Sequence, residues 1–314
     1  MLGDMSRVRM LSSGVRPRTH AGLVLALSYI AQPFKYRGVQ RLSWEFSRFF
    51  SHDDAVTVQI SDDTRLIVQL DDGYWTSLLN RNYTYEAEIA ALLHRMLTPD
   101  TYFLDCGANI GYWTMLCRNR ARAVAAVEAS PTTYRHLEAN AKLNNADVSL
   151  IHAALWHTDG ETLTILEHAQ QHAGATVRGD NAHAKEDGWH PANVTSITLR
   201  SLIEEHCPDP SAPIIIKLDV EGAEIPAIEG AGDTLRKRNV IVVYEDHGSD
   251  PRCEVTRHLQ RLGMVTADLV TGMRLTVEEI ADQKIQKWRG YNYLAYYPEA
   301  IERWPSNEAP ARAL

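Results

Sequence analysis

The alternation of apolar and polar positions divides the chain into a short first part and a longer second part. Near residue 55, the runs AVTVQI and RLIVQL alternate on either side of SDDT, which predicts a β-hairpin. The following DDGYWTSLLN is expected to continue this small β element. Residues 85–97, YEAEIAALLHRML, carry apolar residues at helical spacing and precede Thr98 and Pro99, so we expect a helix that ends there.

From residue 101 onward, short apolar runs alternate with helical segments. Runs that are apolar throughout are typical of parallel strands buried on both faces, with the helices as cover. The predicted strands read YFLD, AVAAVEA, VSLIHAAL, PIIIKLD, NVIVVYED and YNYLAYYP, and the helices read PTTYRHLEANAKLN, ITLRSLIEEH and EIPAIEGAGDTLRKR. The pattern therefore predicts an α/β fold with a doubly wound, mostly parallel sheet.

Two segments stand outside this alternation. Residues 167–193 are polar, rich in His, Gly and Ala, and without periodicity, so we expect a long loop that acts as an active-site lid. Near the N-terminus, AGLVLALSYIA is apolar but shorter than the roughly 20 residues that span a bilayer. Basic residues precede it, as in a signal peptide, but no small-residue cleavage site follows. We expect an amphipathic helical segment that packs on the domain or on a second copy in a homodimer.

Composition narrows the class of protein. The 314 residues suffice for one large core with an appendage. A net charge of -8 argues against a nucleic-acid partner, because such proteins usually carry a basic face. The four cysteines are scattered without a CxxC pair, which favours neither a disulfide framework nor a thiolate zinc site. A cytoplasmic protein with no membrane span is expected.

The stretch FLDCGANIGYWT, residues 103–114, predicts a strand, a tight turn and a helix. Ligands of open α/β sheets bind at such strand ends. Asp105 closes the strand, and Gly107 and Gly111 allow a close approach of backbone to ligand. The middle glycine of the dinucleotide fingerprint is missing, and the acid in front would repel a diphosphate. A ligand with an ammonium or sulfonium group is favoured.

Glu128 ends the next predicted strand, where doubly wound folds place a carboxylate for ribose hydroxyls. NAD requires the same carboxylate, so an NAD-dependent oxidoreductase is one interpretation. The glycine spacing suits an amino-acid moiety better than a diphosphate, which favours S-adenosylmethionine.

Together, FLDCGANIGYWT, VEASPTTYRHLEANAKLNN, AALWHTDGETLTI and IIIKLDVEGAEIPAIEGAGDTL resemble the FkbM family of S-adenosylmethionine-dependent methyltransferases. The resemblance covers about residues 85–247. It implies the class I methyltransferase (Rossmann-like) fold, whose seven-stranded sheet has an antiparallel strand near its end, here YNYLAYYP. It also implies methylation of hydroxyl oxygens in secondary metabolites or sugars.

The resemblance implies roles for individual residues. Cofactor binding is implied for Glu86, Asp105, Gly107, Asn109, Gly111, Glu128, Ala129, Ser130 and Ala154. Arg200, in ITLRSL, stands where the family usually has an aspartate. That departure indicates either a negatively charged substrate or an arginine that faces solvent.

Candidate catalytic residues follow two later strands. Lys217 and Asp219 alternate on one strand with Glu221 in the next loop, and Glu245 and His247 end the neighbouring strand. Asp219 would position the cofactor amine or the acceptor hydroxyl. His247 is the first choice for general base because its unperturbed pKa lies near neutrality, and Glu245 would orient it or act itself. A structural Lys217–Asp219 ion pair and a strand-capping His247 are the alternatives.

A divalent metal is compatible with Asp219, Glu245 and Asp246 as oxygen ligands, although the spacing does not require one. Glu224 and Glu229 are expected to be first-turn and surface charges. The remaining candidates are histidines whose spacing matches no standard zinc site, so we expect a solvated loop, with His172 as a lesser base candidate. They are His157, His168, His172, His183 and His190.

The predicted organisation has four parts. Residues 1–54 form an N-terminal helical segment, 55–98 the hairpin and lead-in helix, 99–300 the cofactor-binding domain with a lid-like insertion at 167–195, and 301–314 a C-terminal tail. The expected function is O-methylation of a hydroxyl on a small metabolite, natural product or sugar. A non-catalytic, partner-binding methyltransferase-like module and the NAD-dependent oxidoreductase remain as alternatives.

Overall fold

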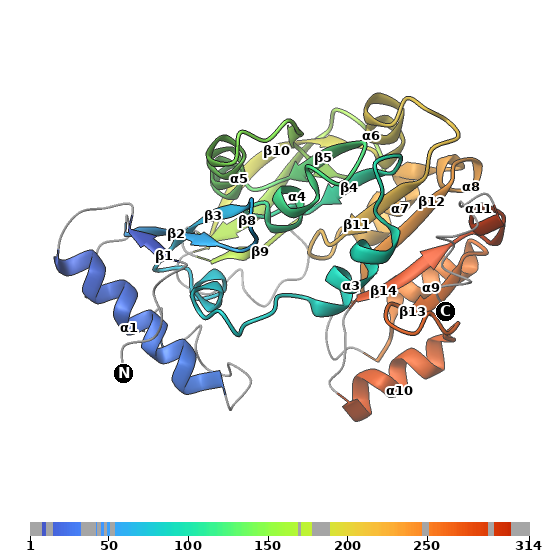
Figure 1. Cartoon of the computed structure of the whole chain (residues 1–314). Helices are drawn as coiled ribbons and strands as arrows, with labels where there is room; N and C mark the ends of the chain where they lie inside the picture. Colours follow the sequence, from blue (N-terminus) through green and yellow to red (C-terminus); the bar gives the residue numbers. More distant parts are fainter. Residues whose placement is uncertain are drawn as a thin grey trace.

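A central seven-stranded sheet organises the chain in the computed structural model (Figure 1). The structure describes residues 8–10, 15–32, 42, 45–46, 49–50, 54–168, 171–177, 189–246, 251–287 and 292–302. The sheet order is β13-β14-β12-β11-β4-β5-β6. Its strands are β4 (Tyr102–Cys106), β5 (Ala123–Glu128), β6 (Ser149–His152), β11 (Ile214–Leu218), β12 (Val240–Glu245), β13 (Val265–Asp268) and β14 (Asn292–Tyr296).

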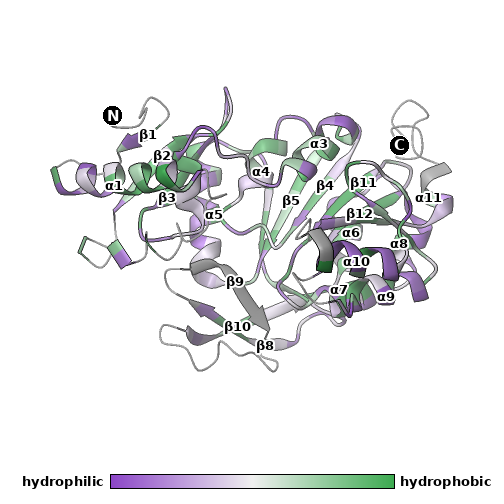
Figure 2. Cartoon of the chain, turned by 90° about the horizontal axis from the view of Figure 1, so that it is seen from below, coloured by the Kyte–Doolittle hydropathy of each residue, from purple (hydrophilic) through white to green (hydrophobic). Residues whose placement is uncertain are grey.

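The central strands are apolar along their whole length because helices cover both faces of the sheet. Phe103, Ile215 and Ile241 face one core, which contains α3 (Ala87–Met96), α4 (Tyr112–Cys117) and α5 (Pro131–Leu143). The alternate positions face a second core with α6 (Leu199–His206), α7 (Glu224–Ala231), α8 (Thr234–Lys237), α9 (Glu254–Arg261), α10 (Val277–Lys287) and α11 (Pro298–Glu302). Figure 2 shows apolar residues along β5 and polar residues on α9 and α10.

Strand directions confirm the predicted fold class. β4 pairs in parallel with β5 on one side and with β11 on the other. The strands that follow β4 in the sequence therefore lie on both sides of it in the sheet. β14 runs antiparallel to its neighbours β12 and β13. This is the class I methyltransferase arrangement, and its ligand crevice lies at the carboxyl ends of β4 and β11.

The N-terminal region packs on the same core as α3 and α4. It contains α1 (Val15–Ala31) and a three-stranded antiparallel sheet of β1 (Val8–Met10), β2 (Ala55–Gln59) and β3 (Arg65–Gln69), which includes the predicted hairpin. The expectation that DDGYWTSLLN continues this sheet is wrong. It forms a 3₁₀ helix, η2 (Trp75–Leu79), because the Asp72 carboxylate accepts the N–H groups of Tyr74 and Trp75 and turns the chain. Among the described residues, every helix is too short or too polar to cross a bilayer.

A second, four-stranded sheet has the order β7-β10-β8-β9. Its strands are β7 (Ala154–Leu155), β8 (Thr162–His168), β9 (Gln171–Val177) and β10 (Trp189–Ile197). The prediction of a structureless loop over residues 167–193 is therefore wrong at the end of β8, at β9 and at the start of β10. Backbone pairing, such as that of β8 with β10, stabilises strands whose polar residues give no alternating signal. Whether this second sheet acts as a lid stays a prediction.

Candidate functional site

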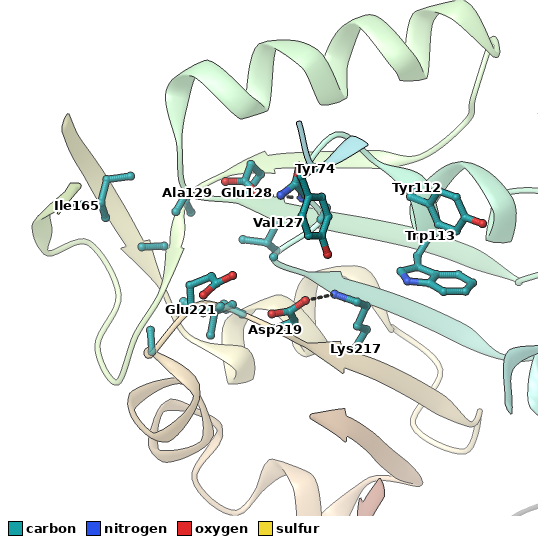
Figure 3. Close-up of a pocket in the computed structure, with 18 of the residues that line it drawn as sticks. Tyr74, Tyr112, Trp113, Val127, Glu128, Ala129, Ile165, Lys217, Asp219 and Glu221 are labelled. Carbon is teal, nitrogen blue, oxygen red and sulfur yellow. Dashed lines mark hydrogen bonds and ion pairs between the residues drawn. The ribbon is translucent and has the colours of Figure 1, made fainter. Parts of the chain in front are cut away.

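The turn after β4 brings three strand ends together. The N–H groups of Gly107 and Ala108 donate to the Val127 carbonyl oxygen of β5, at 3.0 and 2.9 Å. Gly107 has a φ of +78°, and a Cβ there would lie only 1.7 Å from the carbonyl oxygen of Asp219, which follows β11. Only glycine fits this close contact. The three ends surround a main pocket with about 820 Å³ of empty space, part of which is open to solvent (Figure 3).

Glu128 supplies a buried carboxylate to this pocket. One oxygen accepts the Asn109 N–H at 2.9 Å, and the other accepts the Ser130 N–H at 2.8 Å. Burial raises the pKa of Glu128 to about 7, although these backbone hydrogen bonds oppose the change. The carboxylate is therefore held in one orientation and gains negative charge near neutral pH.

Asp105 lies behind the wall of the pocket. One of its oxygens accepts the Thr114 hydroxyl at 2.5 Å, and Oδ1 has no hydrogen-bond partner among the described residues. Burial raises the pKa of Asp105, and the charge of Lys217 opposes that rise. Its carboxylate adds negative charge beneath the turn.

Lys217 balances the charges of several acids. Its ammonium lies 2.8 Å from Asp219 Oδ2, and both residues line the pocket, where Figure 3 shows them facing each other. Burial lowers the pKa of Lys217, but the charges of Asp219, Glu86 and Asp105 outweigh that effect and hold it above its ordinary value. A protonated lysine therefore lies among three carboxyl groups.

Asp219, Glu221 and Glu245 offer carboxylate oxygens that lie within 4.8 Å of one another. Burial, followed by the charge of Asp219 and a hydrogen bond to it, raises the pKa of Glu245 well above its ordinary range. Glu245 therefore keeps its proton and donates it in the hydrogen bond to the Asp219 carboxylate. Such a pair shares one proton.

A strained turn places Glu221 beside Asp219. Glu221 has a φ of +48°, a left-handed conformation that is costly for a residue with a Cβ. The buried Glu224 carboxylate accepts the N–H groups of Val220 and Gly222 and so holds the turn in place. Glu224 was expected to be a first-turn, surface charge; it lies in the first turn of α7 but is buried, whereas Glu229 is exposed.

Glu86 joins the helical cover to the sheet edge. Its φ of +40° is also left-handed. Trp113 Nε1 donates to Glu86 Oε2 at 2.7 Å, and Asn292 Nδ2 donates to Oε1 at 3.2 Å. Burial raises the pKa of Glu86, opposed by the charge of Lys217. Glu86 thus connects Trp113 of α4 to Asn292 at the start of β14.

Five aromatic rings in contact form one side of the pocket, which we call the aromatic wall. Neighbouring ring centroids lie 4.9–6.2 Å apart. Tyr74 and Trp75 belong to the stretch expected to continue the small β element, and Tyr112 and Trp113 follow the glycines as ordinary helix residues. The rings belong to Tyr74, Trp75, Tyr85, Tyr112 and Trp113, all of which line the pocket.

Apolar residues, three of them alanines, line the side of the pocket next to Glu128. They are Ala129, Ala153, Ala154, Leu155 and Ile165. The β8 strand is tied to this side by Glu167, which accepts the Ser130 hydroxyl at 2.5 Å and bonds to His190 Nε2 at 2.9 Å. The second sheet is therefore hydrogen-bonded directly to the loop that orients Glu128.

The structure separates the predicted cofactor residues into two groups. Gly107, Asn109, Glu128, Ala129 and Ala154 line the pocket. The others support it from behind: Glu86 and Asp105 through the contacts above, Gly111 at the start of α4, and Ser130 as the N-cap of α5.

Among the predicted catalytic residues, Lys217, Asp219 and Glu221 line the pocket, and Glu245 contacts Asp219. His247 lies outside the described residues. Asp246 does not join the carboxyl cluster, because alternation along the strand end turns it to the opposite face, where Lys284 and Thr256 bind it. Arg200 is exposed and lies over Gly232, away from the residues that line the pocket.

A family model described as the methyltransferase FkbM domain matches residues 105–268, just over half of the chain. The hexuronic acid methyltransferase AglP of Haloferax volcanii is 23% identical over 206 residues, covering 64% of this chain and 78% of that protein. The strand-end acids described above lie within the matched region.

Solved structures of similar fold have low sequence identity. The methyltransferase FkbM of Methylobacillus flagellatus KT is 14% identical with a TM-score of 0.37, and the match covers 63% of this chain and 44% of that one. The chain thus spans less than half the length of that protein. TYW2 of M. jannaschii in complex with AdoMet is 11% identical with a TM-score of 0.38, covering 78% and 85%. By the domain match, the chain belongs to the FkbM methyltransferase family.

Proposed function

We propose that this protein is an S-adenosylmethionine-dependent O-methyltransferase that acts on a hydroxyl of a sugar or another small metabolite. The observation that carries the proposal is the placement of two kinds of acid in one pocket. Glu128, held by two backbone N–H groups, and Asp219 lie on different sides of the pocket (Figure 3). Asp219 shares a proton with Glu245. The name of the hexuronic acid methyltransferase relative supports a sugar acceptor.

The pocket fits the parts of this cofactor. The fixed carboxylate of Glu128 suits two ribose hydroxyls as donors, and the apolar side chains beside it suit an adenine ring. The ring faces of the aromatic wall suit a sulfonium, because cations are attracted to aromatic faces. When bound, S-adenosylmethionine supplies an electrophilic methyl group.

Methylation of a hydroxyl releases a proton, and Asp219 is the proposed acceptor. Its carboxylate is oriented from two sides, by the Lys217 ammonium and by the proton on Glu245. A positioned base contributes about 10²–10⁴-fold to rate. The aromatic wall excludes water from the same space, which strengthens these electrostatic interactions.

We leave a metal ion out of the proposal. Asp219, Glu221 and Glu245 lie close enough to share one. However, Lys217 and the proton on Glu245 already offset the negative charge of Asp219, so a cation would have to displace that proton.

Calorimetric titration with S-adenosylhomocysteine tests the proposal. We expect saturable binding to the wild type and to Glu138→Gln, an exposed acid on α5 that serves as the matched control. Glu128→Gln should weaken binding at least about tenfold, because one oxygen that accepts a ribose hydroxyl becomes an amide donor. Absence of binding to the wild type, or binding of NAD in its place, would overturn the proposal.

A further inference from the structure

A second, larger pocket lies beside the main one and has no role in the account above. It has about 1190 Å³ of empty space, part of which is open to solvent. Its walls come from the start of α3, the end of β13 with the loop that follows, α10, and the start of β14. In Figure 1, α3 and β14 lie next to each other at this end of the sheet.

Asn292 connects the second pocket to residues that support the main one. This residue lines the second pocket and is paired with Glu245 across the antiparallel β12–β14 ladder. Directly paired residues place their side chains on the same face of a sheet. The Asn292 amide also donates to Glu86, which supports the aromatic wall of the main pocket. The second pocket therefore opens one strand away from the acid pair to which we assign the acceptor hydroxyl.

Polar groups line part of this second pocket. Glu88 and Asp268 bring carboxylates, and Asn292 and Gln283 bring amides.

The other part is aliphatic. Leu269 and Leu275 are buried, whereas Val270 and Met273 are 57% and 66% exposed at the rim. Arg95 holds the rim loop from the α3 side through the carbonyl oxygens of Leu269 and Val270. An aliphatic wall facing a set of acceptors and amides is complementary to a sugar ring, which has a C–H face and hydroxyl edges.

We infer that the second pocket binds the body of the methyl acceptor, and that this body is a neutral, hydroxyl-rich group such as a glycosyl residue. The inference rests on the proposed function and adds the charge class of its substrate. Carboxylates accept hydrogen bonds from hydroxyls but repel an anion in a partly buried site. Glu88 and Asp268 therefore select a neutral sugar over a uronate of the same shape.

The test uses the full chain saturated with S-adenosylhomocysteine. Ligand-observed NMR measures the affinities of methyl glycosides of glucose, galactose and mannose, each matched to its uronide. We expect at least one neutral glycoside to bind saturably and at least about tenfold more tightly than its uronide. Glu88→Gln should narrow that difference, whereas the exposed Glu278→Gln on α10 should leave it unchanged.

A second pair of variants tests the location. Val270→Trp fills the rim and should weaken glycoside binding at least about tenfold, while Ile285→Trp, 63% exposed on α10, should not. Absence of saturable glycoside binding to the wild type, tighter binding of the uronides, or no effect of Val270→Trp would each overturn the inference. Binding of S-adenosylhomocysteine is measured on the same samples. If it did not bind, the result would reject the proposed function instead of this inference.

Discussion

Gly107 and Asp219 touch through their backbones: a Cβ on Gly107 would lie 1.7 Å from the carbonyl oxygen of Asp219. This contact joins the turn after β4 to the end of β11. Asp219 is the proposed base, and Gly107 lines the same pocket. The distance between the methyl donor and the acceptor hydroxyl therefore depends on position 107, which tolerates no side chain.

Gly107→Ala should therefore disrupt the site. We expect loss of S-adenosylhomocysteine binding and a fall in the free energy of unfolding of more than about 2 kcal/mol, because the φ of +78° and the backbone collision both oppose a Cβ. Gly160→Ala is the matched control. Its φ is +77° with open space around the added Cβ, so only about 1 kcal/mol should be lost. Chemical denaturation and calorimetry measure both effects, and equal losses in the two variants would contradict this account.

Glu128 should make stability depend on pH. Burial raises its pKa from 4.5 to about 7, so the folded protein binds this proton more tightly than the unfolded chain does. The stabilisation is complete below about pH 4.5 and is lost as pH rises through about 7, a change of up to about 3 kcal/mol. Denaturation of the wild type and Glu128→Gln between pH 5 and about 8 measures it. The variant should lack this contribution to the slope; parallel curves would reject the prediction.

The two members of the acid pair should differ in their effect on methyl transfer. Asp219→Asn removes the proposed base and should lower kcat by about 10²–10⁴-fold with an acceptor that the wild type methylates. Glu245→Gln keeps a neutral donor to Asp219 and should remain within about tenfold of the wild type. If His247→Ala instead caused the large loss and Asp219→Asn did not, His247 would be the base.

Methyl transfer should not require a divalent cation. The Asp219 carboxylate is already balanced by Lys217 at 2.8 Å and by the proton on Glu245. We expect the same initial rate after treatment with EDTA, and no recovery of rate on adding Mg²⁺ or Mn²⁺. A rate that fell with EDTA and returned with either ion would assign a metal to the cluster of Asp219, Glu221 and Glu245.

Glu167 should influence cofactor binding through Ser130. It accepts the Ser130 hydroxyl at 2.5 Å, and the Ser130 N–H orients Glu128. Glu167→Gln should weaken S-adenosylhomocysteine binding by about threefold to tenfold, since one charge-assisted hydrogen bond is lost. Glu161→Gln, an exposed acid just before β8, should bind normally. Calorimetry at constant pH measures both affinities. Unchanged affinity in Glu167→Gln would show that the sheet containing β8 does not influence cofactor binding.

Local pattern was sufficient for the strand-end acids and for the strands of the central sheet except β13, which was not predicted. Apolar residues run through β4, β5, β11 and β12 because both faces of these strands are buried. Such runs can be recognised from the sequence alone. Glu128 and Asp219 were identified because parallel strands bring their carboxyl ends to one edge. β9 and β10 were missed because pairing between strands, rather than local hydrophobic alternation, stabilises them.

Other features depend on packing between distant segments. Glu245 and Asp246 are neighbours in sequence, yet only the placement of helices on the two faces shows that Glu245 meets Asp219 while Asp246 binds Lys284. The second pocket joins positions from Glu88 to Tyr293, so no single stretch contains its pattern. The end of a strand can be located from the sequence, because the strand repeats one backbone geometry and so gives a regular residue pattern. A cavity cannot be located in this way, because it arises where side chains from separate elements fail to fill the space between them.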